Sequence, residues 1–156
     1  MAEVDDILSA ARAAGLRLVT AESCTGGLVA AALTDIPGSS DVFDRGFVTY
    51  SNAAKMQMLG VQAATLAEFG AVSPQTAVEM AEGALKNADA QLAVAITGIA
   101  GPGGSEFKPE GRVCFALARQ GRATRSETVE FGAQGRAAVR RAATRHALDL
   151  LASNLR

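Results

Sequence analysis

The segment TAESCTGG places two potential nucleophiles, Ser23 and Cys24, shortly before a pair of glycines. A serine on a strand-to-helix turn can point its hydroxyl into a cleft, where the backbone N–H groups of Thr25, Gly26 and Gly27 could stabilise an oxyanion. Cys24 is an alternative nucleophile, because a helix N-terminus lowers the pKa of a thiol. In a purely structural interpretation, Ser23 or Thr25 caps the following helix. The spacing does not distinguish between these three interpretations.

A nucleophilic serine needs a base, and Lys55 in the segment VTYSNAAK is the better candidate. A lysine that is desolvated in a cleft can lose its proton and accept one from a hydroxyl. Tyr50, in the same segment, could orient or relay that proton. The only histidine, His146, lies near the apolar stripe of the last predicted helix, where a structural role is more common than a catalytic one. A solvated Lys55 and a Tyr50 ring packed on the sheet are the structural alternatives.

A third segment, TGIAGPGG, places four glycines at the end of an apolar strand. Such a loop can direct several backbone N–H groups toward an anion. It lacks the Gly-Lys-Ser/Thr ending of a nucleoside-triphosphate P-loop and does not follow the dinucleotide pattern GxGxxG. An ordinary tight crossover is the alternative interpretation. The candidate binding residues of this segment are Thr97, Gly98, Gly101, Gly103 and Gly104.

All three segments follow predicted strands, and in open α/β sheets ligands bind beyond the carboxyl ends of strands. Strands are predicted at 16–21, 43–51 and 91–98, an antiparallel hairpin at 111–119 and 123–131, and helices at 4–15, 27–36, 53–59, 73–85 and from 135 onward. Asn52 is predicted to cap the helix at 53–59, and Ser73 with Pro74 to start the next long helix. This order predicts an α/β fold, a single three-layer α/β/α domain with a mixed, mainly parallel sheet that carries one antiparallel hairpin.

Length and composition restrict the classes of protein to which this chain can belong. Its 156 residues, 49% of them hydrophobic, contain no long polar tract, so we expect one domain spanning residues 1–156. A net charge of −1 without a basic run argues against nucleic acid or an anionic membrane as a partner. The cysteines at 24 and 114 form neither a disulfide framework nor a metal-ligand pair, which fits a reducing cytoplasm. We therefore expect small-molecule chemistry without a metal.

Five segments in order resemble the C-terminal domain of the CinA (competence/damage-inducible protein) family: TAESCTGG, VTYSNAAK, AVSPQTAVEMAEGAL, AITGIAGPGG and FGAQGRAAVRRAA. The resemblance extends over about residues 4–155. It implies hydrolysis of the carboxamide of nicotinamide mononucleotide to nicotinate mononucleotide and ammonia, in pyridine-nucleotide recycling. It also implies a serine nucleophile at Ser23, a lysine base at Lys55 and an assisting tyrosine at Tyr50, without a cofactor or metal.

The same resemblance implies that the ribose phosphate contacts the glycine-rich loop or a helix N-terminus, together with Arg136 or Arg140 of the last helix. Two departures from the family pattern bear on this pocket. The stretch SEFKPEGRV replaces the usual continuation of the glycine-rich loop, and QGR replaces the common GDR, which removes an acidic neighbour of Arg136. We expect a nucleotide substrate, a homo-oligomer, and no pyrophosphatase activity of the kind tied to the extra N-terminal domain of longer members.

Two other functions stay open at the level of sequence. The chain could be an amidase with a different substrate, because a fold and a nucleophile do not determine specificity. It could also be a non-catalytic nucleotide-binding or regulatory module in competence or DNA-damage responses. Ammonia release from nicotinamide mononucleotide distinguishes these alternatives.

Overall fold

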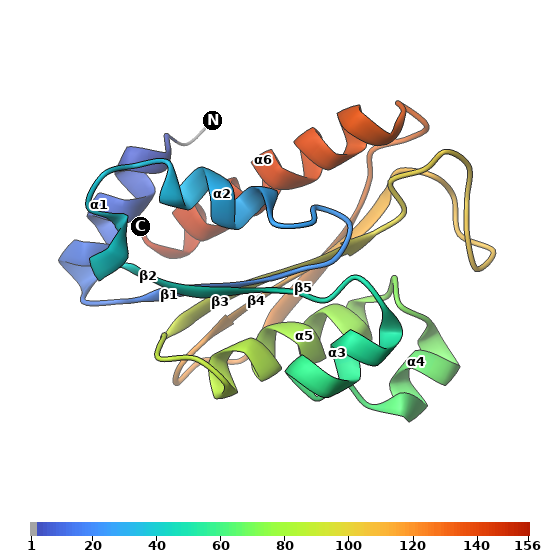
Figure 1. Ribbon diagram of the computed structural model, residues 1–156, viewed down its shortest axis with the longest axis horizontal. Helices are drawn as coiled ribbons and strands as arrows, with labels where there is room; N and C mark the ends of the chain where they lie inside the picture. Colours follow the sequence, from blue (N-terminus) through green and yellow to red (C-terminus); the bar gives the residue numbers. More distant parts are fainter. Residues whose placement is uncertain (1–2) are drawn as a thin grey trace.

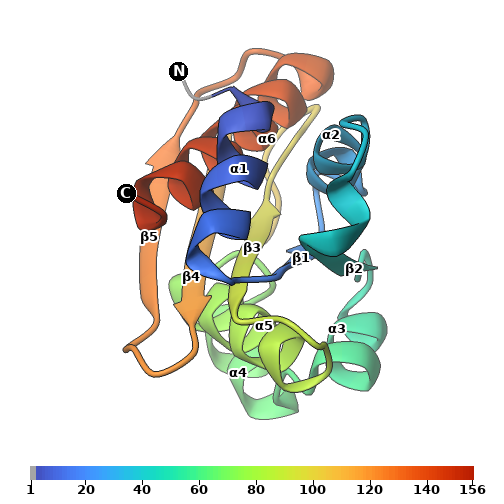
Figure 2. The ribbon, with the colours of Figure 1, turned by 90° about the vertical axis from the view of Figure 1, so that its left-hand side faces the viewer.

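The structure is a computed structural model that describes residues 3–156, so residues 1 and 2 of the predicted domain lie outside the described range. A five-stranded sheet of order β2-β1-β3-β4-β5 has helices on both faces (Figures 1 and 2). The strands are β1 (Leu18–Glu22), β2 (Phe43–Val48), β3 (Leu92–Gly98), β4 (Arg112–Arg119) and β5 (Arg125–Glu130). The helices are α1 (Val4–Ala14), α2 (Leu28–Thr34), the 3-10 helix η1 (Ser39–Asp41), α3 (Asn52–Leu59), α4 (Ala63–Phe69), α5 (Pro74–Lys86) and α6 (Arg136–Asn154).

The sheet combines a parallel half with an antiparallel half, as predicted. Strand β1 pairs in parallel with β2 and β3, whereas β3, β4 and β5 pair antiparallel, and β4 and β5 form the predicted hairpin. In the parallel half, Glu22 is opposite both Val48 and Ile96, so β1, β2 and β3 reach the same edge of the sheet. The segments that follow these three strands therefore begin at one edge of the sheet, as predicted, and the helices on both faces (Figure 1) confirm the three-layer α/β/α prediction.

Each face of the sheet has its own hydrophobic core. Branched and aromatic side chains of β3 and β4, such as Ile96 and Phe115, pack under α1, α2 and α6. On the opposite face, alanines of the same strands pack against α5, with α3 and α4 outside it (Figure 1). Because alanine side chains are short, α5 lies close to the sheet. Within residues 3–156, no helix is long and apolar enough to cross a membrane.

Helix α3 is held against α5 by a close backbone contact. A Cβ atom at Gly83 of α5 would lie 1.9 Å from the carbonyl oxygen of Leu59, the last residue of α3, so only glycine fits there. The cap of α3 differs from the prediction: Ser51, not Asn52, accepts the hydrogen bond from the Ala54 N–H. Asn52 is already the first helical residue, so the cap lies one position earlier.

One helix and one strand end differ from the sequence prediction, and the start of α5 is confirmed. Helix α4 was not predicted, because only Thr65 among its seven residues is buried and no apolar periodicity marks it. Strand β2 ends at Val48 rather than at residue 51, and the following residues cross the top of the sheet. Helix α5 begins at Pro74 with the Ser73 hydroxyl accepting the Thr76 N–H, as predicted.

Helix α2 begins on a buried carboxylate rather than on a conventional cap. Glu22, the last residue of β1, is completely buried, and its Oε1 accepts hydrogen bonds from the Thr25 hydroxyl (2.7 Å), Gly27 N–H (3.2 Å) and Val29 N–H (3.0 Å). Its Oε2 accepts the Ala30 N–H at 3.0 Å. The interpretation of Thr25 as the helix cap is therefore wrong, because its hydroxyl donates to Glu22. The negative charge also complements the positive end of the helix dipole.

Replacing Glu22 by glutamine should destabilise the fold. A glutamine side chain offers one acceptor oxygen, and its amide hydrogens would oppose an N–H that Glu22 now accepts, so at least one buried donor would lose its partner. We expect the free energy of unfolding to fall by about 1–3 kcal/mol. Urea denaturation measures this change. The control Glu68→Gln, at an exposed residue of α4, should shift stability by less than about 0.5 kcal/mol; equal stability of both variants would contradict the role given to Glu22.

Candidate active site

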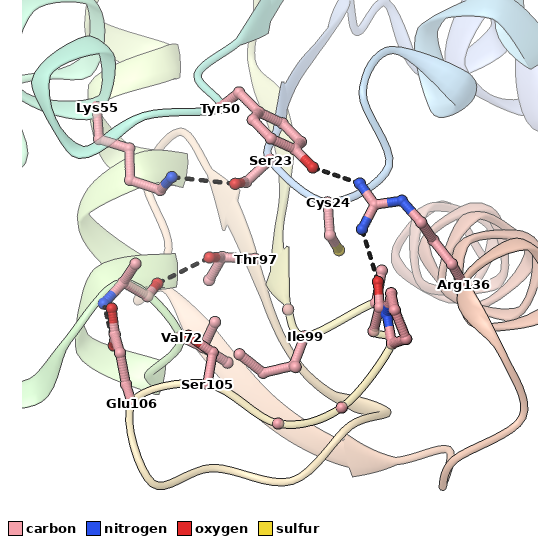
Figure 3. Close-up of a pocket in the computed structure, with 17 residues that line it drawn as sticks. Ser23, Cys24, Tyr50, Lys55, Val72, Thr97, Ile99, Ser105, Glu106 and Arg136 are labelled. Atoms are coloured by element: carbon pink, nitrogen blue, oxygen red, sulfur yellow. Dashed lines mark hydrogen bonds between the residues drawn. The ribbon is translucent and has the colours of Figure 1, made fainter.

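A cavity of about 320 Å³ opens at the edge of the sheet where β1, β2 and β3 end (Figure 3). This volume is in the range of small-molecule sites. Its walls come from the turn after β1, the segment after β2, the loop before α5, the loop after β3 and the start of α6. The lining residues are Ser23, Cys24, Tyr50, Lys55, Ala71, Val72, residues 97–106 and Arg136.

Ser23 and Lys55 meet at the base of this cavity. The Lys55 Nζ donates hydrogen bonds to Ser23 Oγ at 3.0 Å and to the Thr49 carbonyl oxygen at 2.8 Å (Figure 3). Ser23 N–H donates to the Ile96 carbonyl at 2.9 Å, which attaches the turn to β3. Ser23 is 8% exposed and Lys55 only 1%. The geometry suits transfer of a proton from the hydroxyl to the amine.

The surroundings of Lys55 favour its neutral form. Burial lowers the pKa of Lys55 from its ordinary value, because desolvation disfavours the ammonium. Negative charge on Cys24 or Glu106 would raise this pKa. Within residues 3–156, the structure gives Lys55 no salt bridge with a carboxylate. A lysine in this environment can act as a general base.

Cys24 also lines the cavity, but its thiol is unsuited to nucleophilic attack. Burial raises the pKa of Cys24 to about 12, and the neighbouring Glu22 charge also raises it. The expectation that the α2 N-terminus lowers this pKa is therefore wrong, because desolvation is the larger effect and Glu22 occupies the helix N-terminus. At neutral pH the thiol is protonated, and the thiolate is the reactive form. The structure thus favours Ser23 over Cys24.

Tyr50 and Arg136 meet at the mouth of the cavity. Arg136 Nη2 donates to the Tyr50 hydroxyl at 2.5 Å, and Nη1 donates to the Gly101 carbonyl at 2.8 Å. Figure 3 shows the Tyr50 hydroxyl directed toward Arg136 and away from Lys55. Tyr50 is 60% exposed, so it borders the opening rather than the base of the cavity. The structure therefore places Tyr50 with Arg136 and not within the Ser23–Lys55 pair.

The residues predicted to form the oxyanion hole make hydrogen bonds within the turn that follows β1. The Gly26 N–H donates to the Ser23 carbonyl at 3.0 Å, and the Gly27 N–H donates to Glu22. Thr25 is completely buried with its hydroxyl on Glu22. None of Thr25, Gly26 and Gly27 is among the lining residues of the cavity. The N–H groups of both glycines already have partners within the turn. The predicted substrate contacts of these three residues stay a prediction.

Arg140 also makes its hydrogen bonds to the turn that follows β1. Its Nε donates to the Cys24 carbonyl at 3.1 Å and its Nη2 to the Thr25 carbonyl at 3.4 Å, and it is not a lining residue. A Cβ atom on Gly26, where φ is +58°, would lie 3.2 Å from Arg140 Nη2. Arg140 thus fixes the turn from α6. Of the two arginines predicted to contact a phosphate, only Arg136 lines the cavity.

The predicted glycine-rich loop forms one wall of the cavity, with all five of its candidate residues on the lining. Thr97 fixes the neighbouring wall, since its hydroxyl donates to the Ala71 carbonyl at 2.7 Å. The Gly103 N–H donates to a carboxylate oxygen of Glu110 at 2.6 Å, so this N–H is already occupied by an anion of the protein itself. The lining residues are Thr97, Gly98, Gly101, Gly103 and Gly104.

His146 lies away from this cavity, as its structural interpretation predicts. It is hydrogen-bonded to Glu127 of β5, and its ring centroid is 4.5 Å from that of Phe115. Within residues 3–156, His, Cys, Asp and Glu side chains form no group of three or more that could hold a metal ion.

Sequence reasoning missed two side chains and one carbonyl of the site. Glu22 could have been found from the sequence, because it is the one charged residue of strand β1. A carboxylate is unusual in a buried strand unless it has buried hydrogen-bond partners. Glu106, on the lining, falls in the stretch that departs from the family pattern. The Thr49 carbonyl that accepts from Lys55 had no signal, because any residue type supplies a carbonyl.

Comparison with known proteins agrees with this fold. The family model described as the CinA C-terminal domain matches residues 2–155. The chain is 56% identical over 151 residues to nicotinamide-nucleotide amidohydrolase PncC of Escherichia coli K12, covering 94% of this chain and 89% of that protein.

Two solved structures share the fold over nearly their whole length. Competence/damage inducible protein CihA from Agrobacterium tumefaciens superposes with a TM-score of 0.87 at 51% identity, covering 95% of this chain and 94% of that one. A competence or damage-inducible protein from Enterobacter asburiae gives a TM-score of 0.94 at 38% identity, covering 98% and 96%. Together with the family-model match, these relatives show that the chain belongs to the CinA C-terminal domain family.

Proposed function

We propose that this chain hydrolyses the carboxamide of nicotinamide mononucleotide to nicotinate mononucleotide and ammonia. The observation that carries the proposal is the buried Lys55 Nζ, 3.0 Å from Ser23 Oγ at the base of an open cavity. The name of the Escherichia coli relative supports the nucleotide amide as the substrate class. A cytoplasmic location, a homo-oligomer and a domain spanning residues 1–156 stay predictions.

In the first half of the reaction, neutral Lys55 accepts the Ser23 proton while Ser23 Oγ attacks the amide carbonyl carbon. The tetrahedral adduct carries negative charge on the former carbonyl oxygen. The Lys55 ammonium, now adjacent to Ser23, lies close enough to stabilise that charge. The ammonium then gives its proton to the amide nitrogen, the C–N bond breaks, and ammonia leaves an ester on Ser23.

In the second half, water hydrolyses this ester by the reverse use of the same groups. Lys55, neutral again, takes a proton from the attacking water, and the adduct collapses with cleavage of the bond to Ser23 Oγ. The proton returns from Lys55 to Ser23, and nicotinate mononucleotide is released. The Thr49 carbonyl accepts one N–H of Lys55 throughout, so the amine stays oriented toward Ser23.

The phosphate of the nucleotide is assigned to Arg136 at the mouth of the cavity. Its guanidinium is anchored by Gly101 and Tyr50 and is the only arginine on the lining within the described residues. An anchored guanidinium binds a phosphate with charge-assisted hydrogen bonds. Tyr50 is then a support for Arg136 at the phosphate end, rather than a proton relay.

Ammonia release from a panel of nicotinamide, its riboside, its mononucleotide and the dinucleotide tests the proposed function. We expect the mononucleotide to be turned over with the highest kcat/KM, because it alone presents both the carboxamide and a terminal phosphate. A higher kcat/KM for another compound of the panel than for the mononucleotide would identify an amidase of different specificity. A lack of turnover with all four would favour a non-catalytic binding module.

Substitution of the two candidate nucleophiles should have opposite effects. Ser23→Ala removes the attacking oxygen and should abolish ammonia release while the unfolding midpoint stays close to wild type. Cys24→Ala should retain much of the activity, since a thiol with a pKa of about 12 is not the attacking group. An inactive Cys24→Ala with an active Ser23→Ala would reverse this assignment.

The base is tested at Lys55, with His146 as the control. Lys55→Met and Lys55→Arg should each lower kcat by about 100-fold or more with a much smaller effect on KM, because neither side chain can accept the serine proton at neutral pH. His146→Ala should stay within about twofold of wild type. In the wild type, kcat/KM should rise with pH as Lys55 deprotonates, with an apparent pKa below the ordinary 10.5. An active Lys55→Arg would exclude Lys55 as the base.

Chelation should leave the activity unchanged. The reaction as written uses only Ser23, Lys55 and water, and the described residues hold no cluster of metal-ligand side chains. We expect the same rate of ammonia release before and after dialysis against EDTA. Loss of activity that a divalent ion restores would require a metal in the mechanism.

A further inference from the structure

The cavity carries a carboxylate, Glu106, on the wall formed by the loop between β3 and β4. Ser105 and Lys108 bond to each other through both backbone groups, so Glu106 and Phe107 form the tip of a tight turn. Their φ angles are +54° and +63°, as a type I′ turn requires. The turn therefore fixes where the carboxylate stands, and Glu106 Oε2 is anchored by the Ala71 N–H at 3.3 Å.

The positive charge nearest to Glu106 among its ion-pair partners is Lys108, at the long end of ion-pair distance. Lys108 Nζ is 3.9 Å from Glu106 Oε2, but it donates shorter hydrogen bonds of 2.6 Å to the Phe69 and Val72 carbonyls. The Glu106 side chain is 43% exposed. Its negative charge is thus only partly balanced and acts on the cavity.

The charged side chains on the lining come from different walls of the cavity. Figure 3 shows Arg136 on one side, Glu106 on another, and the Ser23–Lys55 pair on the wall between them. The Glu106 charge raises the pKa of Lys55, which opposes the neutral form that a base needs. A carboxylate in this place therefore hinders the catalytic base of the empty cavity.

A substrate with a positively charged ring removes this conflict. When nicotinamide is joined to ribose through its ring nitrogen, the ring becomes a pyridinium cation, while the phosphate at the other end is an anion. A cation next to Glu106 offsets the effect of that carboxylate on Lys55. The same ring carries the carboxamide, on the side away from the ribose. A ring between Glu106 and Ser23 therefore presents its carboxamide to Ser23, while the phosphate contacts Arg136.

We propose that Glu106 is a specificity-determining residue that selects substrates whose amide-bearing ring is positively charged. The inference rests on the proposed function and deepens it. Glu106 discriminates against nucleotides of the same shape that have a neutral ring, whereas Arg136 recognises the phosphate that both share. The preference for the cation comes from Coulomb attraction across a partly exposed cavity, so its size should be moderate and should fall at high salt.

The test compares two nucleotides that differ in ring charge. Nicotinamide mononucleotide has a cationic ring, and its dihydro form has a neutral ring with the same ribose, phosphate and carboxamide. Calorimetric dissociation constants are measured in the Ser23→Ala background, so that binding is separated from the different reactivities of the two amides. Each nucleotide is titrated into Ser23→Ala alone and into Ser23→Ala combined with Glu106→Gln, which keeps an acceptor for the Ala71 N–H.

We expect Glu106→Gln to weaken binding of the cationic nucleotide about three- to tenfold and to change the dihydro nucleotide by less than about twofold. Glu68→Gln, which removes an exposed carboxylate that does not line the cavity, should change neither constant. An equal loss for both nucleotides, or no loss for either, would overturn the inference. So would an absence of binding by both nucleotides.

Ammonia release by the wild-type chain separates this inference from the function on which it rests. If wild-type protein deamidates nicotinamide mononucleotide while the Glu106 variant shows no charge-dependent binding, only the role of Glu106 fails. If wild-type protein releases no ammonia, the proposed function fails whatever the binding constants are.

Discussion

The buried carboxylate of Glu22 is the interaction on which the geometry of the site depends. It closes the turn between β1 and α2 by accepting from one hydroxyl and three backbone N–H groups. Ser23 is the next residue, so its position follows from the strand on one side and from this closed turn on the other. The same carboxylate also occupies the α2 N-terminus, which leaves the cysteine thiol beside it without the activation that a helix end can give. The Glu22 charge thereby holds the serine in place and adds to the burial that raises the pKa of the Cys24 thiol.

The chemistry then depends on the burial of Lys55. An ammonium with no carboxylate partner is costly to bury, and the fold tolerates it because a carbonyl and a hydroxyl accept its hydrogen bonds. That cost is also the source of its function, since desolvation brings the neutral amine closer to physiological pH. The close contact of Gly83 with Leu59 matters for the same reason. It holds the helix that carries Lys55 against the body of the protein.

Much of this architecture could be predicted from the sequence. Hydrophobic periodicity over several residues predicts helices and strands, and glycine or proline residues mark where they begin and end. The hairpin, the long helices and the shared edge for TAESCTGG, VTYSNAAK and TGIAGPGG were all predicted and confirmed. Lys55 was proposed as the base for Ser23 because each residue follows a strand that ends at the same edge of the sheet, and the family resemblance implied the same pair. Two residues 32 positions apart show no mutual spacing signal of their own. The detailed roles of Thr25, Gly26, Gly27 and Arg140 could not be predicted. A polar residue beside a nucleophile can face the substrate or support the turn, and only three-dimensional packing distinguishes the two.

The departures from the family pattern fall at two charged places on the cavity lining, at Arg136 and at Glu106. Losing the acidic residue before α6 leaves Arg136 with a neutral phenol and a carbonyl as its partners. A guanidinium with neutral partners retains its full charge for a phosphate, whereas a salt bridge would already satisfy it. At the second place, the turn that carries Glu106 is anchored by backbone pairing and not by a large core. This turn can therefore change in sequence without affecting the hydrogen bond between Ser23 and Lys55.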